Sequence, residues 1–444
     1  MRHLSFTIDL PIEMTALAGL ALSALCGHAQ SAAIPHRQVI VAENSTISQN
    51  LANDAATAGS TIVTLGSRRS SNAVDASSLV PLRSVDVESL SYSGPGPARR
   101  YFITELGTLG GTQSFAYALN DNGQVVGESW TVGDSSSHAF LFTNGKMTDL
   151  YPLNSQDIQT VGPTAINNAG QIASGVVVDG VYVPAILDSV TGNLILIGSL
   201  GGVSSLGFKG VATSVNNEGN ATGYSYLDNL NRHGFFYRNG VMTDIGSFGG
   251  FSVGLAINDE NDIAGFASDT YNGVAHAFVD TDGVMTDLDP ATESYGNDIN
   301  NQSQIVGQFL TADQTAFHAF LYSQGNFADP TPSGGQSAIA NGINNEGQIV
   351  GSQSFADKLH AFLYYNGRIV DLNTLIPRDF GWELIRACDV NNRGQIVGYG
   401  LVHNRFRAYL LTPAISPDQC NYDAWKSFGF RNQGQCIGYV NTGK

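Results

Sequence analysis

The segment Leu119-Asn120-Asp121-Asn122-Gly123-Gln124-Val125-Val126-Gly127 is one of seven related copies along the chain. We call its first asparagine the marker, and successive markers are separated by 47, 49, 42, 42, 44 and 47 residues. A repeat of about 40 to 50 residues that carries strand-like segments is typical of a propeller or a solenoid. The seven markers are Asn120, Asn167, Asn216, Asn258, Asn300, Asn344 and Asn391.

Each copy predicts a tight hairpin at the marker. An aliphatic residue precedes every marker, and Asn or Asp follows it in all seven copies. The third residue after the marker is Gly in five copies, while Asn261 and Ser303 take that place in the other two. Because Gly, Asn and Asp tolerate positive φ and favour turns, the apolar segments on either side are expected to pair as strands.

Two further apolar segments complete each repeat. The third segment reads His-Ala-Phe-Leu, as in His138–Leu141, and a turn such as Asn144-Gly145 separates it from a fourth segment such as Met147–Leu150. No segment has a sustained helical period. Each repeat is therefore predicted to form four strands in an antiparallel meander, and such units stack as blades around an axis.

The two ends of the repeat region predict how the stack closes. The seventh copy has three strands, the last at Ala408–Leu411, and no fourth strand follows. A matching segment stands before the first copy, at Phe102–Gly107. Since an open stack would leave unpaired strand edges, this segment is expected to complete the last blade. The prediction is an all-β, seven-bladed β-propeller over residues 100–413, closed by an N-terminal outer strand.

Three phrases together resemble the bacterial HAF-repeat family of extracellular proteins. They are His-Ala-Phe, the phrase at Asn344–Gly351 and the phrase at Leu106–Gly111. The resemblance covers roughly residues 100 to 412 and implies a secreted bacterial repeat protein with no defined catalytic activity. The second copy departs from the pattern, because Pro184–Leu187 stands where His-Ala-Phe-Leu is expected.

The N-terminal region predicts export from a bacterial cell. An apolar run from Met14 to Cys26 is too short to span a bilayer and suits the core of a signal sequence. Residues 1–33 are predicted to be a signal peptide, so that the protein is secreted or extracellular. Residues 34–99 carry no repeat and are interpreted as a linker or a weakly ordered leader.

The C-terminal residues 414–444 form a separate module with its own aromatic residues, Trp425 and Phe428 among them. The phrase that ends in Cys436 resembles the short cysteine-paired tails of many secreted bacterial proteins. This resemblance implies a disulfide between Cys420 and Cys436. A tail of this size needs such a link to be ordered, and the pairing fits an oxidising compartment.

Charge and composition limit the classes of partner and cofactor that the protein is expected to bind. The formal charge is −17, which argues against nucleic acid and anionic membranes. No transmembrane segment is predicted, and the oligomeric state is left open. We predict no cofactor and no metal site: the histidines that recur at one blade position lie away from the axis and cannot share one ion, so they are expected to make structural hydrogen bonds. These histidines are His138, His233, His276, His318 and His360.

No catalytic residue is predicted, because nucleophile elbows, zinc-protease signatures and Cys-x-x-Cys are all missing from the sequence. The favoured function is a secreted, non-catalytic binding module for an extracellular polysaccharide or a protein surface. The alternative is a propeller hydrolase or lyase acting on glycans, which needs two acids that converge at the mouth of the central channel.

A binding site is expected on the face that carries the more variable loops. These loops connect the second strand to the third, and the fourth strand to the next blade, so they emerge opposite the repeated hairpins. Aromatic side chains there could stack on sugar rings or peptides. The candidate ligand-binding residues are Trp130, Tyr226, Tyr271, Phe309, Phe355, Arg378, Trp382 and His403.

Overall fold

The computed structural model describes residues 100–150, 159–271, 273–289, 292–331, 337–355 and 358–443. The predicted signal peptide and the predicted linker or leader lie outside the described residues. No helix among the described residues is long and apolar enough to cross a membrane.

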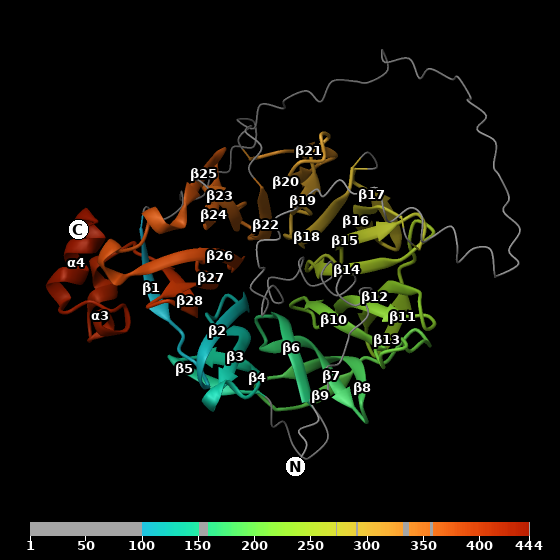
Figure 1. Cartoon of the computed structure of the whole chain (residues 1–444), viewed down its shortest axis with the longest axis horizontal. Coiled ribbons are helices and arrows are strands. Elements are labelled where there is room, and N and C mark those ends of the chain that lie inside the picture. Colours follow the sequence, from blue (N-terminus) through green and yellow to red (C-terminus); the bar gives the residue numbers. More distant parts are fainter. Residues whose placement is uncertain are drawn as a thin grey trace, which may run out of the picture. The chain divides into compact units, whose positions relative to one another are not determined.

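The repeats form seven four-stranded antiparallel sheets, which are the blades of a β-propeller, as predicted (Figure 1). The strands of each blade follow from the innermost outward. Blade 1 consists of β2 (Gly110–Leu119), β3 (Val125–Thr131), β4 (Ser137–Thr143) and β5 (Lys146–Asp149), and blade 2 of β6 (Gln159–Ile166), β7 (Gln171–Val178), β8 (Val181–Asp188) and β9 (Leu194–Leu196). Blade 3 consists of β10 (Gly210–Val215), β11 (Ala221–Tyr226), β12 (Arg232–Arg238) and β13 (Val241–Asp244), and blade 4 of β14 (Ser252–Ile257), β15 (Ile263–Ser268), β16 (Ala275–Thr281) and β17 (Val284–Asp287). Blades 5 to 7 consist of β18 (Ser294–Ile299), β19 (Ile305–Leu310), β20 (Phe317–Ser323) and β21 (Asn326–Ala328); β22 (Ala338–Ile343), β23 (Ile349–Phe355), β24 (Lys358–Tyr365) and β25 (Arg368–Asp371); and β26 (Trp382–Val390), β27 (Ile396–Val402), β28 (Arg405–Pro413) and β1 (Tyr101–Glu105). Short 3-10 turns η3 (Val132–Asp134), η4 (Leu372–Thr374) and η5 (Arg378–Phe380) lie in the connections.

Blade 7 combines strands from both ends of the repeat region. Its outermost strand is β1, which pairs antiparallel with β28, so that Tyr101 lies opposite Pro413 and Glu105 lies opposite Tyr409. In Figure 1 the blue β1 lies beside the red and orange strands of this blade. Backbone hydrogen bonds therefore join β1 and β28, the first and the last propeller strands along the chain.

The first strands of adjacent blades contact one another and surround a central channel. The hairpins at the markers have the backbone that the sequence predicts: Gly123 has φ of 75°, and the two exceptions Asn261 and Ser303 also have positive φ, 72° and 55°. A feature that the repeats did not reveal is an irregular register in every first strand. In blade 1, for example, the shift lies between Ala116 and Ala118, three residues before the marker.

The phenylalanine of His-Ala-Phe is the largest core residue of most blades. Examples that are fully buried are Phe140, Phe235, Phe278 and Phe320. The small residue before this phenylalanine leaves room for the next blade. A serine in the first strand of that blade accepts a hydrogen bond from the backbone N–H of the small residue. The N–H of Ala277, for example, donates to Oγ of Ser294 at 2.9 Å. The repeated phrase therefore serves packing within a blade and bonding between blades.

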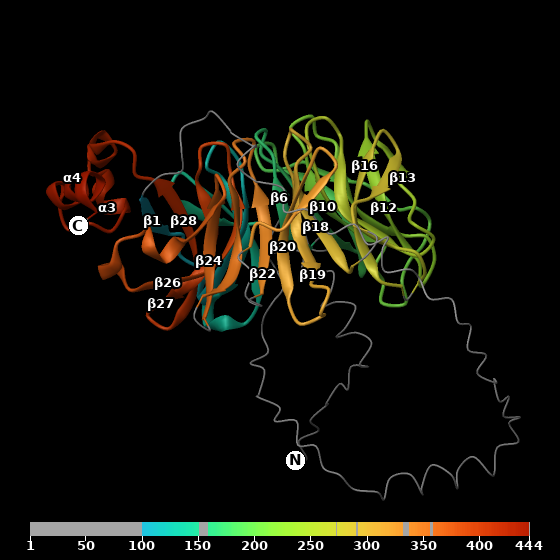
Figure 2. The same ribbon diagram turned by 90° about the horizontal axis from the view of Figure 1, so that it is seen from above.

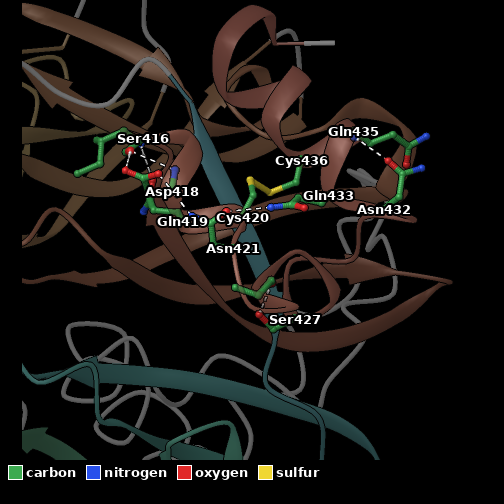
Figure 3. The surroundings of a disulfide bond; sticks show 12 residues. Ser416, Asp418, Gln419, Cys420, Asn421, Ser427, Asn432, Gln433, Gln435 and Cys436 are labelled. Atoms are coloured by element: carbon green, nitrogen blue, oxygen red, sulfur yellow. Dashed lines mark hydrogen bonds between the residues drawn. A yellow bond between two sulfur atoms is a disulfide. The ribbon is translucent and has the colours of Figure 1, made fainter.

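The C-terminal tail contains η6 (Pro417–Cys420), α3 (Ala424–Ser427) and α4 (Gln433–Thr442). The predicted disulfide between Cys420 and Cys436 is present, and Figure 3 shows it between η6 and α4. The Asn432 side chain caps α4 by accepting a hydrogen bond from the Gln435 N–H at 2.9 Å. Both cysteines are buried, since a small core surrounds them.

The core of the tail includes a residue of the propeller. The ring of Phe102 on β1 stacks on Phe428 with centroids 4.1 Å apart. The Tyr439 hydroxyl of α4 lies 2.9 Å from the Tyr101 carbonyl oxygen and 2.8 Å from the Leu375 carbonyl oxygen. The tail therefore packs on the outer side of β1, as Figure 2 also shows.

Candidate functional site

Two faces of the propeller differ in chemistry. The hairpins between first and second strands, and between third and fourth strands, emerge on what we call the marker face. The connections from the second to the third strand, and from each blade to the next, emerge on the opposite side, which we call the loop face. The alternation follows from the antiparallel order of the four strands.

The marker asparagines form a closed ring of hydrogen bonds on the marker face. The Nδ2 of each marker donates to the backbone carbonyl of the next marker, at distances from 2.8 to 3.1 Å, and Asn391 donates back to Asn120. Each marker is also buried, and its Oδ1 accepts backbone N–H groups of its own hairpin in the copies around Asn120 and Asn344. The marker thus joins its own turn to the neighbouring blade.

The residues that follow the markers form a second closed ring. The backbone N–H of each donates to the side-chain Oδ1 of the next, at 2.8 to 3.1 Å, around all seven blades. Five of these residues are asparagines, and the other two are the aspartates Asp121 and Asp259. Each carboxylate accepts hydrogen bonds from the amides of both neighbours; for Asp259 these are Asn217 and Asn301.

The environment of Asp259 favours its charged form. Burial raises its pKa, but the backbone N–H of Asn217 and the amides of Asn301 and Asn217 outweigh burial and hold the pKa below the usual range. A cavity of about 160 Å³ lies at this end of the channel, lined by the marker and its two neighbours in every blade. Since the side chains around it already bond one another, this cavity offers few free groups to a ligand.

Two acids in the first strands form a second polar feature, which the sequence analysis missed. Asp298 and Asp389 stand two residues before their markers, where the other blades have Ala, Ser or Gly. Burial raises the pKa of Asp298 to about 8, and the charge of Asp389 adds to the rise. Burial also raises the pKa of Asp389, to about 6. Comparison of this one position across the seven copies would have revealed both acids.

The oxygens of both acids are engaged with backbone groups of neighbouring blades. Oδ2 of Asp298 accepts the N–H of Ile343 at 2.8 Å, and Oδ2 of Asp389 accepts the N–H of Leu119 at 2.9 Å. The other oxygen of each accepts the N–H of the next residue in the chain. These bonds place Asp298 and Asp389 in the seams between blades, where they join one first strand to the next.

The repeated histidines make structural hydrogen bonds in the described residues. Nδ1 of each lies 2.8 to 2.9 Å from a carboxylate oxygen of an aspartate at the end of the fourth strand. In blade 7 the equivalent contact joins Arg407 to Glu105 of β1, with Nε 2.9 Å from Oε1. In blade 2 the strand register places Val183, and not Pro184, at the histidine position, so the expected alignment of that copy is wrong by one residue.

Three of the predicted loop-face residues pack on blade cores. Phe309 contacts the rings of His318 and Phe327, with centroids 6.1 and 5.4 Å apart. Phe355 lies over the ring of His360, and Trp382 packs on the core of blade 7. Much of the surface of these three aromatic side chains is therefore used for stability.

Of the other five predicted residues, three are exposed and two are half-buried, as Phe309, Phe355 and Trp382 also are. Tyr271 is 42% exposed, Arg378 and His403 are exposed, and Trp130 and Tyr226 are half-buried. The eight candidates belong to six blades, and no hydrogen bond or ring contact between described residues joins any two of them. The structure therefore places them around the loop face and does not gather them at one point.

Exposed apolar side chains concentrate on the loop face. They come from the connections within blades 1, 3, 4 and 6 and from the connection between blades 2 and 3. On the marker face, the hairpins at the markers contribute none among the described residues, and the hairpins between third and fourth strands contribute Val190, Val241 and Val284. The loop-face residues are Val132, Val203, Leu206, Leu230, Tyr271, Val274 and Leu359.

Within the described parts of the chain, no three His, Cys, Asp or Glu side chains come close enough together to hold a metal ion. Comparison with protein-family models and with curated proteins finds no match.

Solved structures with a similar fold include a peptidase, TolB and a lyase, all of low identity. A puromycin-hydrolyzing peptidase of Mycobacterium tuberculosis is 8% identical with a TM-score of 0.44, and the match covers 68% of this chain and 52% of that one. TolB from Acinetobacter baumannii is 12% identical with a TM-score of 0.36, covering 69% and 65%. An oligogalacturonate lyase from Vibrio parahaemolyticus is 9% identical with a TM-score of 0.41, covering 70% and 93%. The chain spans about half the length of the first of these structures, and at these scores the likeness carries no functional conclusion.

Proposed function

We propose that the chain is a secreted, non-catalytic binding module that holds an extracellular polysaccharide or a protein surface on its loop face. The observation that carries the proposal is the difference between the two faces. On the marker face, turn side chains bond one another around the whole ring. On the loop face, apolar side chains from several blades are exposed without a covering segment among the described residues. Contiguous exposed apolar patches mark interaction sites, and we propose that the loop-face residues contribute to such a patch.

Secretion and membership of the HAF-repeat family belong to the same proposal. The resemblance of the repeated phrases supports both, and the disulfide of the tail fits an oxidising compartment. An N-terminal sequence analysis of the protein recovered from the growth medium tests secretion directly, because a cleaved signal peptide removes the first residues.

Two valines provide a matched test of the binding face. Val132 on the loop face and Val190 on the marker face are both 76% exposed. We expect Val132→Ser and Tyr271→Ala to weaken retention of the full chain on a panel of bacterial and plant polysaccharides, or on an immobilised surface protein. Val190→Ser is the control and should bind as the unmodified chain does. Equal effects of the two valine substitutions would refute the assignment of the face.

A glycan hydrolase or lyase is the second candidate, and the two seam acids favour it. Asp298 and Asp389 have raised pKa values, as the general acid of a glycosidase requires. Against it, the oxygens of both accept backbone N–H groups. Release of oligosaccharides from the panel, abolished in Asp298→Asn, would establish the enzyme in place of the binding module.

A further inference from the structure

One arginine on the loop face occupies a position that is uncharged in every other blade. Arg232 is the first residue of β12 and lies opposite Tyr226 in the register of blade 3. The register of the other blades identifies the equivalent residue in each. Those residues are Ser137, Tyr182, Ala275, Phe317, Leu359 and Phe406. A residue that differs from the repeat is not explained by the needs of the blade alone.

The charge of Arg232 is buried without a counter-ion. Only 8% of its surface is exposed, and its Nε has no hydrogen-bond partner among the residues that the structure describes. No ion pair joins Arg232 to any acid of the described chain. Its Cζ lies 5.4 Å from the ring centroid of Tyr224 and 5.2 Å from that of Phe251, at the start of blade 4.

The nearest acid in the loop before Arg232 is fully used by its own turn. Oδ1 of Asp228 accepts the N–H groups of Leu230 and Asn231, and its Oδ2 accepts the Asn231 amide. The two aromatic rings compensate part of the cost of burying a cation, since each attracts positive charge. They supply no acceptor for the N–H groups, and a buried guanidinium without an anion is unfavourable.

Tyr226 and Lys209 extend this cluster toward solvent. Tyr226 is half-buried, and its ring lies 6.1 Å from that of Tyr224 in an edge-on arrangement. Lys209 is half-buried and forms no ion pair in the described part of the chain, and its carbonyl accepts the Tyr226 N–H at 2.9 Å. Lys209 and Arg232 therefore lie on either side of Tyr226 in the sheet of blade 3, and neither forms an ion pair within the described residues.

We propose that this seam is a subsite for the carboxylate of an acidic sugar, with Arg232 as the anion-binding residue, Lys209 beside it and Tyr226 as the surface on which the sugar ring stacks. The inference rests on the proposed binding function of the loop face and names its ligand class. A guanidinium matches the two oxygens of a carboxylate, and an amphipathic aromatic ring suits the apolar face of a sugar. Because the chain carries a charge of −17, any attraction for a carboxylate comes from these local cations and not from the net charge.

Two sugars that differ only in oxidation of C6, tetramannuronate and mannotetraose, provide the test. Isothermal titration calorimetry of the full chain at about 0.15 M salt, where charges are screened beyond about 8 Å, compares them. We expect tetramannuronate to bind at least about tenfold more tightly than mannotetraose, and Arg232→Gln to abolish that preference. Lys209→Gln should weaken tetramannuronate by a smaller factor.

The control is Arg393→Gln, which removes one exposed positive charge from the marker face and should leave the affinity for both sugars unchanged. Equal binding of the two sugars by the unmodified chain would overturn the inference, whatever the polysaccharide panel shows for the loop face. A hexaglutamate peptide that binds as tightly as tetramannuronate would overturn it in favour of a protein carboxylate. If Arg232→Gln does not fold, unchanged binding by Lys209→Gln would likewise overturn the subsite.

Discussion

Replacement of one marker asparagine should destabilise the whole propeller. Asn344 is 4% exposed, and its Nδ2 lies 2.8 Å from the Asn391 carbonyl oxygen of the next blade and 2.9 Å from Oε1 of Gln348. Its Oδ1 accepts the N–H groups of Glu346 and Gln348 at 3.0 and 2.9 Å. Asn344→Ala removes all four hydrogen bonds and leaves buried groups without partners.

The expected loss follows from these four bonds. A hydrogen bond contributes about 1 kcal/mol net to stability, and an unsatisfied buried partner costs more. The turn N–H groups can recover water, since Glu346 is partly exposed. We therefore expect Asn344→Ala to lower the free energy of unfolding by roughly 2 to 4 kcal/mol. Urea unfolding followed by tryptophan fluorescence measures this change through the transition midpoint.

Asn326→Ala provides the matched control, because Asn326 is exposed at the start of β21 and makes only a weak contact at 3.4 Å. Its effect should stay within about 0.5 kcal/mol. Asn344→Asp separates the two halves of the network, because it keeps the acceptor oxygens and loses the donor to Asn391. If Asn344→Ala and Asn326→Ala lose the same stability, the ring of markers does not hold the blades together.

Three further outcomes are expected. Burial raises the pKa of Asp298 to about 8. The protonated side chain therefore contributes to stability fully below about pH 4, and this contribution is lost as the pH rises through the pKa of the folded state. Urea midpoints at about pH 5 and about pH 8.5 should differ less in Asp298→Asn than in the unmodified chain. Gly347→Ala should cost about 1 to 2 kcal/mol, measured by thermal unfolding, because φ is 70° there although space for a methyl group is open. The double variant Cys420→Ser with Cys436→Ser opens a link across 16 residues and should destabilise the tail by roughly 3 kcal/mol, seen as faster limited proteolysis of the tail; an unchanged rate would show that packing on Phe102 suffices.

Much of the fold could be predicted because the same pattern of apolar segments and turn residues occurs seven times along the chain. Marker hairpins require turn residues that accept positive φ, and the structure has positive φ even at Ser303. The alternation of apolar segments and turns defines four strands in each copy. The structure also confirms the disulfide between Cys420 and Cys436, which a resemblance of the tail implied.

The site was less predictable, because exposure is a property of neighbouring blades and not of sequence position. Phe355 and Tyr271 occupy similar connections, yet one ring lies over His360 and the other is 42% exposed. Arg232 is one charged residue among many in the sequence. Only the register shows that its equivalents in other blades are uncharged, and only the structure shows that it forms no ion pair among the described residues.

The sequence by itself determined the blade count, the order of strands in a blade and the position of the turns, because each depends on residues close together in one repeat. The tertiary structure alone decided the contacts between repeats: the hydrogen bonds from each marker to the next, the bonds of Asp298 and Asp389 across blade seams, and the position of the Phe251 ring of blade 4 beside Arg232. The hydrogen bonds among these contacts join residues more than 40 positions apart, as between Asn120 and Asn167, and the closure of the ring determines which residues become partners. A local pattern contains no information on which side chain the neighbouring blade will present.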